Sequence, residues 1–316
     1  MPPVAAIDCG TNSTRLLVAD EDGRSLTRRM TITRLGAGVD RTRRLAGDAV
    51  GRTLAVLREY RGIMDDLEVD AVRMTATSAA RDAANRSDFL TAAAEVVGVA
   101  PELLDGEEEA RLSFAGATAD LDPATGPWLV ADVGGGSTEL AAGPAAGRRL
   151  EPRAVRSVDM GCVRVTERFL AHDPPRPAEL EAGRRFVAAE LESASSAAPG
   201  LRGAARLIGL AGTVAAAAML DLRLDHYDRA AVHHRVVTAA TVASLLDELA
   251  TLDVGARRAR PGMEPERAPV IVGGLLVLDG ILGHFGFPAC LASEADILDG
   301  LAMSLLPDLR RASRAE

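Results

Sequence analysis

Lysine is missing from this sequence, so all 36 of its positively charged side chains are arginines. A phosphate-binding loop or a kinase-type site that depends on a lysine is therefore excluded. Contacts with phosphate would have to come from arginine side chains, backbone N–H groups or a bound metal ion. Coding bias explains the missing lysine better than function does.

Cysteine and long apolar runs are also scarce. The three cysteines, Cys9, Cys162 and Cys290, are far apart and form no Cys-x-x-Cys pair, which favours a reducing compartment and no structural zinc. No run of about 18 uncharged apolar residues occurs, and the first residues lack a basic segment followed by an apolar one. We therefore expect a cytoplasmic protein with neither a membrane span nor a signal peptide.

The charge balance limits the partners of the protein. The formal net charge is −9, which argues against bulk attraction to nucleic acid or to an anionic membrane. A polyanion would have to meet a local basic patch. Six arginines gather early in the chain and could form such a path, although a solvated loop is the alternative: Arg28, Arg29, Arg34, Arg41, Arg43 and Arg44.

Two similar stretches carry the strongest signal. Residues 6–18 read AIDCGTNSTRLLV and residues 130–140 read VADVGGGSTEL. In each, an apolar strand ends at an Asp and is followed by a glycine-containing turn and a small hydroxyl residue. Backbone N–H groups of such a turn converge on an anion, and a neighbouring Asp is useful when a divalent cation lies between the carboxylate and the phosphate. The pair predicts phosphate and Mg²⁺ in a cleft between two related domains.

The rest of the pattern is that of an α/β protein with 47% hydrophobic residues in 316, enough for two domains. The polar, Pro- and Gly-containing residues 120–127 predict the boundary, giving domains at 1–122 and 123–295 with a helix at about 296–316 that packs back on the first domain. We expect strands at 4–8, 16–19, 26–34, 71–75, 102–104, 128–132, 139–142, 149–158, 205–210 and 288–292. The main expected helices are 48–67, capped by Asp48, then 89–97, 107–117, 160–169, 178–195, 213–222, 241–252, a long apolar helix ending near 282, and 296–306.

Two charged residues of the first domain are candidates for chemistry. Arg81 lies where a strand ends and a helix opens, although a surface ion pair with Asp82 is the alternative. Glu107, Glu108 and Glu109 occupy a first helical turn, where carboxylates favour the helix dipole. Glu109 borders the apolar side of that helix, so it is the best candidate for a general base.

Two features of the second domain leave alternatives open. The GLAGT stretch at 209–213 is a third strand–glycine–helix junction, which either lines the cleft or serves close helix–sheet packing. His226, His233 and His234 fall near an apolar segment. Adjacent histidines on a strand point to opposite faces, so we expect no metal site from them.

These motifs resemble the exopolyphosphatase and guanosine pentaphosphate phosphohydrolase family, which is related to actin, sugar kinases and heat-shock ATPases. The resemblance covers nearly the whole chain. Besides the two turn motifs it includes LGAGVD (35–40), ATSAARDAAN (76–85), GEEEARL (106–112), SVDMGCVRVTERF (157–169), GLAGT (209–213), PGMEPERAPVIVGG (261–274) and SEADILDGLA (293–302).

The resemblance implies two ribonuclease-H-like domains of the actin-like ATPase type, with the active site in the cleft between them. It implies Mg²⁺-dependent hydrolysis of a terminal phosphoanhydride by a glutamate-activated water. Glu109 matches the catalytic base, Glu139 a second functional glutamate, and Asp8 and Asp132 the metal-associated aspartates. The implied phosphate ligands are Thr11, Asn12, Ser13, Arg81, Gly134, Gly135, Gly136, Ser137 and Thr138.

The implied substrate is inorganic polyphosphate, with release of orthophosphate from its end. Longer family members carry a further C-terminal helical domain, so this chain resembles the short two-domain form and is expected to prefer short polymers. Guanosine pentaphosphate (pppGpp) is the alternative substrate, although aromatic residues for a guanine pocket are few. A noncatalytic sensor and a nucleotide-driven kinase or chaperone are further alternatives. The family also suggests a homodimer.

Overall fold

The computed structural model describes residues 2–144 and 151–306. These residues form two compact units, and each contains one β-sheet. Unit 1 comprises residues 2–119 and 296–306, and unit 2 comprises residues 120–144 and 151–295. The predicted strand start at 149 and helix end at 316 lie outside the described residues.

Unit 1 is built on a five-stranded sheet of order β3-β2-β1-β4-β5. The first three strands are antiparallel neighbours, and β4 and β5 add in parallel to β1. Its elements are β1 Val4–Cys9, β2 Ser13–Ala19, β3 Ser25–Ile32, α1 Val39–Thr42, α2 Gly47–Asp66, β4 Ala71–Ala76, α3 Ser78–Asp82, α4 Arg86–Val97, β5 Glu102–Leu103, α5 Gly106–Thr118 and α13 Ile297–Leu305.

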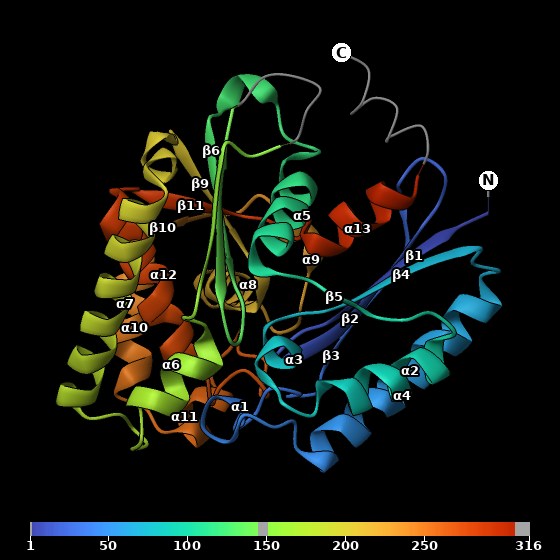
Figure 1. Ribbon diagram of the computed structural model, residues 1–316. Coiled ribbons are helices and arrows are strands. Elements are labelled where there is room, and N and C mark those ends of the chain that lie inside the picture. Colours follow the sequence, from blue (N-terminus) through green and yellow to red (C-terminus); the bar gives the residue numbers. More distant parts are fainter. Residues whose placement is uncertain (1, 145–150, 307–316) are drawn as a thin grey trace. The chain divides into compact units, whose positions relative to one another are not determined.

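Alternation along β1 assigns the two faces of this sheet. Ala5, Ile7 and Cys9 pack in the core that contains α2 and α4, whereas Val4 and Ala6 pack in the core that contains α5 and α13 (Figure 1). Side chains of a strand alternate between faces, so Asp8 points to the α13 side. The sequence of β1 thus decides that the Asp8 carboxylate faces α13 and not α2 or α4.

Glycines bring α5 and α13 into close contact. A Cβ on Gly116 of α5 would lie 1.9 Å from the carbonyl oxygen of Asp296, and a Cβ on Gly300 of α13 would lie 2.2 Å from that of Leu112. Because a side chain at either position would collide with backbone, these helices approach one another only with glycine there. The helix expected at 296–306 therefore belongs to unit 1 and packs on the helix that carries Glu109.

Unit 2 repeats the strand order in a six-stranded sheet, β10-β11-β9-β6-β7-β8. Strands β6, β7 and β8 are antiparallel, and β9 lies parallel to β6. Its elements are the 3₁₀ turns η1 Pro123–Thr125 and η2 Pro199–Gly203, strands β6 Trp128–Val133, β7 Thr138–Gly143, β8 Ala154–Val158, β9 Arg206–Leu210, β10 Val236–Thr238 and β11 Ala289–Ala292, and helices α6 Cys162–Phe169, α7 Pro177–Ala197, α8 Ala211–Leu222, α9 Arg229–Val232, α10 Ala239–Ala250, α11 Val254–Arg258 and α12 Ile271–Phe285.

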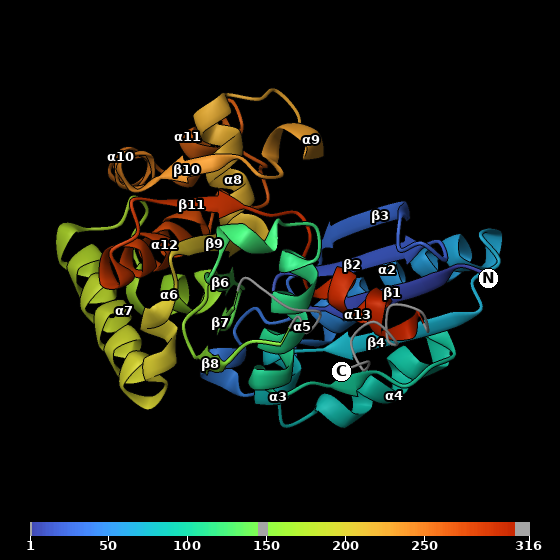
Figure 2. The same ribbon diagram turned by 90° about the horizontal axis from the view of Figure 1, so that it is seen from above.

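Helix α12 is the centre of the unit 2 core. It is apolar on nearly all sides and contacts α6, α7, α8 and α10 (Figure 2). Gly273 and Gly274 allow the close approach, since a Cβ on each would lie 2.3 Å from the hydroxyl oxygen of Thr166 and of Thr213, respectively. The two sheets of like order confirm the predicted α/β class.

Some local expectations are wrong. Asp48 does not cap α2, because the helix begins at Gly47 after Ala46; Asp48 lies in its first turn and pairs with Arg52 at 2.7 Å. The third strand ends at Ile32, two residues before its expected end. Short elements such as α1, α9, α11 and β10 were not expected, because three to five residues do not establish a periodicity.

Candidate active site

The first predicted phosphate turn, residues 10–13, connects β1 to β2. Its carbonyl groups are held by the following loop: the Thr11 oxygen accepts from the Gly36 N–H at 2.8 Å, and the Asn12 oxygen accepts from the N–H groups of Thr33 and Arg34 at 3.1 and 2.9 Å. In a trans peptide the next N–H points opposite to the carbonyl. The N–H groups of Asn12 and Ser13 are therefore turned away from this loop, as an anion-binding turn requires.

The second turn, residues 134–137, connects β6 to β7 and is held in the same way. The Gly134 and Gly135 oxygens accept from N–H groups at the start of α6, those of Cys162 and Val163, each at 2.9 Å. The Gly136 oxygen accepts from Arg164 Nε at 2.6 Å. By the same peptide geometry, the N–H groups of Gly135, Gly136 and Ser137 point the other way.

One glycine braces each turn from behind. A Cβ on Gly36 would lie 2.3 Å from Thr11 Cγ2, and a Cβ on Gly161 would lie 2.4 Å from the carbonyl group of Gly135. Both glycines come from the stretches that follow the hairpins, LGAGVD and MGCVRV. The repeat therefore includes the brace as well as the turn.

Polar side chains of the turns differ in their environment. Thr11 and Ser137 are buried, whereas Asn12 and Ser13 are half-buried. Thr138 is fully buried, and its hydroxyl donates to the Met160 carbonyl at 2.5 Å. The structure gives this hydroxyl a bracing partner, and its role as a phosphate ligand stays a prediction.

Asp8, at the end of β1, is buried and paired with Arg15. Arg15 donates to Asp8 Oδ2 from Nη2 at 2.7 Å and from Nε at 3.2 Å. Burial raises the pKa of the Asp8 carboxyl above its ordinary value, and Arg15 acts against that rise. The Thr75 hydroxyl lies 3.5 Å from the other oxygen, Oδ1.

Asp132 and Glu139 occupy the matching places in unit 2. They are directly opposite one another in the register of β6 and β7, so their side chains share one face of the sheet. Asp132 is 6% exposed and Glu139 is 2% exposed. Ser157, opposite Glu139 on β8, donates to its Oε1 at 2.7 Å. Two buried carboxylates side by side are a hard-oxygen donor set that fits Mg²⁺.

Glu109 and Arg81 form an ion pair in unit 1. Arg81 Nη1 lies 2.6 Å from Glu109 Oε2 and also donates to the Leu104 carbonyl at 3.0 Å. The Glu109 side chain is 12% exposed, whereas that of Glu107 is 52% exposed and pairs with Arg111. The inward placement of Glu109 is confirmed. Asp82 Oδ2 lies 3.8 Å from Arg43 Nη1.

The GLAGT junction opens α8 in unit 2. Ala211 has a left-handed backbone, φ 66°, which is uncommon for a residue with a side chain. The guanidinium of Arg267 lies against Gly212, where a Cβ would be 1.4 Å from Nη1. Arg267 also pairs with Glu264. Gly212 therefore serves close packing. It packs against Arg267 of the 261–274 stretch and not against the sheet.

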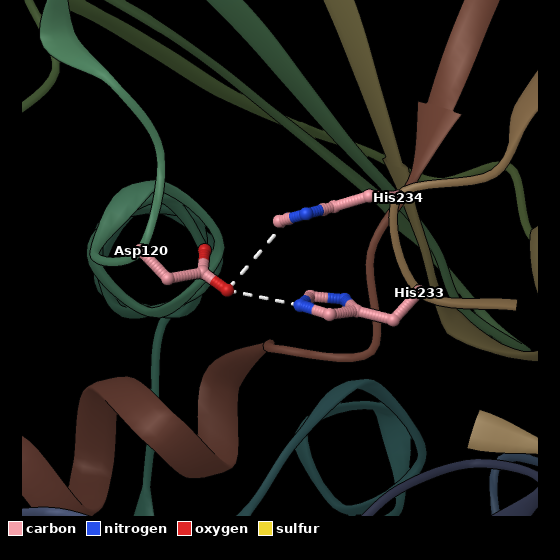
Figure 3. A group of neighbouring side chains, drawn as sticks. All are labelled: Asp120, His233 and His234. Carbon is pink, nitrogen blue, oxygen red and sulfur yellow. Dashed lines mark hydrogen bonds and ion pairs between the residues drawn. The ribbon is translucent and has the colours of Figure 1, made fainter. Parts of the chain in front are cut away.

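The expected geometry of the histidines is wrong. His233 and His234 do not lie on a strand; they follow α9, and their rings stack with centroids 3.8 Å apart. Figure 3 shows both rings turned toward Asp120. Asp120 Oδ2 lies 2.9 Å from His233 Nε2 and 3.7 Å from His234 Nε2, and the three ligand atoms lie within 4.8 Å of one another.

The hydrogen bonds of His233 show which of its ring nitrogens carries the proton. Its Nδ1 accepts from the Glu294 N–H at 3.0 Å, so in the neutral ring the proton is on Nε2 and is donated to Asp120. A ring that donates through Nε2 has no lone pair there for a metal. The arrangement is that of a carboxylate–imidazole contact.

Several residues of the site were not predicted as site residues. In unit 1, Arg15 pairs with Asp296 across 281 positions. In unit 2, Arg164 donates to the Gly136 carbonyl across 28 positions. Of the early arginines, Arg28 is half-buried and pairs with Asp299 and Asp296, so it does not belong to an exposed polyanion path. The others are exposed: Arg29, Arg34, Arg41, Arg43 and Arg44.

The comparison with known proteins agrees with these motifs. The model of the Ppx/GppA phosphatase family matches residues 17–309. The chain belongs to this family. It is 41% identical over 318 residues to exopolyphosphatase 2 of Mycobacterium tuberculosis, covering 96% of this chain and 98% of the relative.

Solved structures of the family share the fold. An exopolyphosphatase-like protein superposes with a TM-score of 0.92 at 33% identity, covering 97% of this chain and 99% of that protein. An exopolyphosphatase from Cytophaga hutchinsonii superposes with a TM-score of 0.87 at 25% identity, covering 97% and 98%. The family assignment predicted from the motifs is confirmed.

Proposed function

We propose that this protein is an exopolyphosphatase that releases orthophosphate from the end of inorganic polyphosphate. The observation that carries the proposal is the pair of braced turns, each with its carbonyl groups anchored and its N–H groups turned outward, in a chain of a phosphatase family. The exopolyphosphatase named among its relatives supports the choice of substrate.

Unit 2 would hold the metal and the phosphoryl oxygens. Asp132 and Glu139 are the residues that would bind Mg²⁺, and the ion would offset negative charge on the phosphoryl group. The N–H groups of Gly135, Gly136 and Ser137 would donate to phosphoryl oxygens. Arg164 is buried, and its Nε donates to the Gly136 carbonyl. This hydrogen bond helps to keep the turn in place.

Unit 1 would supply the base. Glu109 lies in the first turn of α5 with its side chain largely shielded from water. It would orient the attacking water and accept its proton. Arg81 holds one oxygen of this carboxylate, which fixes its direction, and would also contact a phosphoryl oxygen.

The first prediction concerns Glu109→Gln. The amide keeps an oxygen for Arg81 but cannot take a proton, so we expect orthophosphate release from polyphosphate to fall by about 10²–10⁴-fold. Melting temperature should be unchanged. The measurement is Mg²⁺-dependent orthophosphate release with short polyphosphate, long polyphosphate, pppGpp and ATP in parallel.

Glu107→Gln is the matched control, because Glu107 lies in the same helical turn with an exposed side chain. It should keep the wild-type rate. Wild-type rates for Glu109→Gln would contradict the role of Glu109. If the wild type releases no orthophosphate from any of the four substrates, the proposed function is contradicted and a sensor is favoured. Chelation of Mg²⁺ should abolish the activity, and added Mg²⁺ should restore it.

The choice of polyphosphate over pppGpp has one structural support. Trp128 and Tyr60 are buried in the two units, so neither ring is open to a guanine base, and Tyr227, which is 44% exposed, donates its hydroxyl to Glu294. A higher kcat/KM for pppGpp would reverse the choice.

We further propose a cytoplasmic homodimer. The three buried free cysteines fit a reducing compartment, and the described residues include no helix long and apolar enough to span a bilayer.

A further inference from the structure

Among the described residues, the chain passes from unit 1 to unit 2 between residues 119 and 120 and returns between residues 295 and 296. The first connection follows α5, and the return connection precedes α13. Within unit 1 the adjoining helix ends pack closely, since a Cβ on Gly116 would lie 1.9 Å from the Asp296 carbonyl oxygen. The two connections therefore leave unit 1 next to one another.

One imidazole of unit 2 holds a residue of each connection. His233 Nε2 donates to Asp120 Oδ2 at 2.9 Å, and His233 Nδ1 accepts from the Glu294 N–H at 3.0 Å. Asp120 is the first residue of unit 2 and Glu294 is its last but one, so all three residues belong to the same unit. Figure 3 shows the ring turned toward Asp120, and the His233 side chain is 17% exposed. His233 thus couples the two connections.

The loop around His233 holds the return connection at further points. Tyr227 donates its hydroxyl to the Glu294 carboxylate, and Arg229 Nη2 lies 3.5 Å from the Glu294 carbonyl oxygen. The His234 N–H donates to the Ala292 carbonyl at 2.7 Å. The return connection is therefore fixed to this loop, and the His233 ring joins Asp120 to it.

The two hydrogen bonds of the His233 ring require its neutral form. A neutral imidazole has one N–H and one acceptor nitrogen, and here each of them has a partner. A protonated ring carries an N–H on both nitrogens, so Nδ1 would face the Glu294 N–H as a second donor. The contact with Asp120 would become a charged hydrogen bond, which is stronger. Protonation therefore turns the ring away from Glu294 and leaves it with Asp120.

The charged groups near the ring decide where a proton binds. They are Asp120 after α5, Arg229 of α9, the stacked ring of His234 and the Glu294 carboxylate. Burial raises the pKa of Asp120, but the His233 hydrogen bond and the charges of both histidines outweigh burial and bring this pKa below its ordinary value. Two stacked rings repel a second proton, and His233 is nearer to the carboxylate than His234, at 2.9 Å against 3.7 Å. One proton therefore binds at His233.

We propose that His233 is a pH-sensitive coupling residue for the connections between the two units. The neutral ring fixes Asp120 to the return connection, and the protonated ring releases the return connection, so that unit 1 turns more freely relative to unit 2. This device is separate from the proposed hydrolysis, although α5, which ends beside Asp120, also carries Glu109.

The test measures the spread of distances between the units in the full-length protein. Spin labels are attached at Arg24→Cys in unit 1 and Arg185→Cys in unit 2, where the native side chains are 78% and 69% exposed. The three native cysteines are buried and should not take the label. Double electron–electron resonance should give a distance distribution about twofold wider at pH 5 than at pH 8. Equal widths at the two pH values would overturn the proposal.

His233→Gln separates the coupling from a purely structural role. The amide nitrogen can still donate to Asp120, but the side chain has no acceptor at the place of Nδ1 and does not titrate. We expect the wide distribution at both pH values. A narrow distribution at pH 8, or a persisting response to pH, would contradict the proposal. A purely structural role predicts lower stability and no effect of pH on the width.

His234→Asn is the matched control, because asparagine tolerates the left-handed backbone of this position, φ 64°. It removes the neighbouring titratable ring and should keep the response to pH; loss of the response would place the proton on His234 and overturn the proposal. The comparison with histidine at both positions needs neither variant, so it decides even if one does not fold. No substrate is present, so a protein that fails to hydrolyse polyphosphate would contradict only the proposed function.

Discussion

Gly161 shows at the scale of one residue how the second turn is held. The glycine lies against the backbone of Gly135, and the N–H groups that follow it, from Cys162 to Arg164, donate to the turn. Only the absence of a side chain lets α6 begin this close. A glycine outside the turn thus fixes the direction in which the turn's N–H groups point.

We therefore predict that Gly161→Ala displaces the second turn. The new Cβ would lie 2.4 Å from the Gly135 carbonyl, and backbone on one side or the other must move. A displacement of this size at a positioning group costs about 10²-fold in kcat. Steady-state kinetics with polyphosphate would measure it.

Gly62→Ala is the control for this prediction. Gly62 is exposed within α2, and a Cβ there would have no neighbour within 4 Å. We expect unchanged kcat and a gain of about 0.5–1 kcal/mol in unfolding free energy, since alanine has the higher helix propensity. Wild-type kcat in Gly161→Ala would show that the turn does not depend on the brace.

At the scale of elements, the contact between α7 and α12 carries a titratable group. His284 lies in the last turn of α12, and its Nε2 accepts from Ser195 Oγ of α7 at 2.7 Å and from Arg202 Nη2 at 3.2 Å. Burial, and then the charge of Arg202, lower the pKa of His284 below its ordinary value. The folded state therefore favours the neutral ring.

This shift predicts a pH dependence of stability. As pH falls below about 6.5, the ordinary histidine value, the unfolded state takes up a proton before the folded state does, so the unfolding free energy decreases. Urea unfolding between pH 8 and pH 5 would measure the decrease. His284→Gln keeps an acceptor but does not titrate, and it should reduce the slope; an unchanged slope would exclude His284 as a contributor.

At the scale of the whole molecule, both units bury their thiols. Cys9 is in unit 1, and Cys162 and Cys290 are in unit 2. Burial raises the pKa of Cys162 to about 11 and that of Cys290 to about 12, and it raises the pKa of Cys9 as well. The reactive thiolate is therefore rare at pH 8 in the folded protein.

We predict that a thiol reagent at pH 8 labels none of the three cysteines within minutes in the folded protein and labels all three in guanidinium chloride. Cys9→Ser would leave two reporters, both in unit 2, and the difference between the two proteins would report the opening of unit 1. Rapid labelling of the native protein would contradict the buried placement. Mass spectrometry of quenched samples would count the modified residues.

Local patterns allowed much of this protein to be predicted. A strand, an Asp, a glycine turn and a return strand are encoded within about 14 residues, so residues 6–18 and 130–140 identified both hairpins and both turns. Glu109 could be placed because helical spacing alone determines which of three neighbouring glutamates faces the buried side. The long helices followed from apolar periodicity in the same way.

Tertiary structure alone decided the partners of these groups. Arg15 meets Asp296 across 281 positions, Arg164 meets Gly136 across 28, and His233 meets Asp120 across 113. An arginine near the start of a strand, as Arg15 is in β2, has the same local sequence whether it faces solvent or a buried carboxylate. Which of these it meets depends on the helix that packs there. The sequence by itself determined where the chain turns and which groups stand at each turn. The packing of α13 on β1 and β2 and of α6 on the second turn decided which partners these groups meet, because ion pairs and close backbone contacts form between segments that local propensity does not connect.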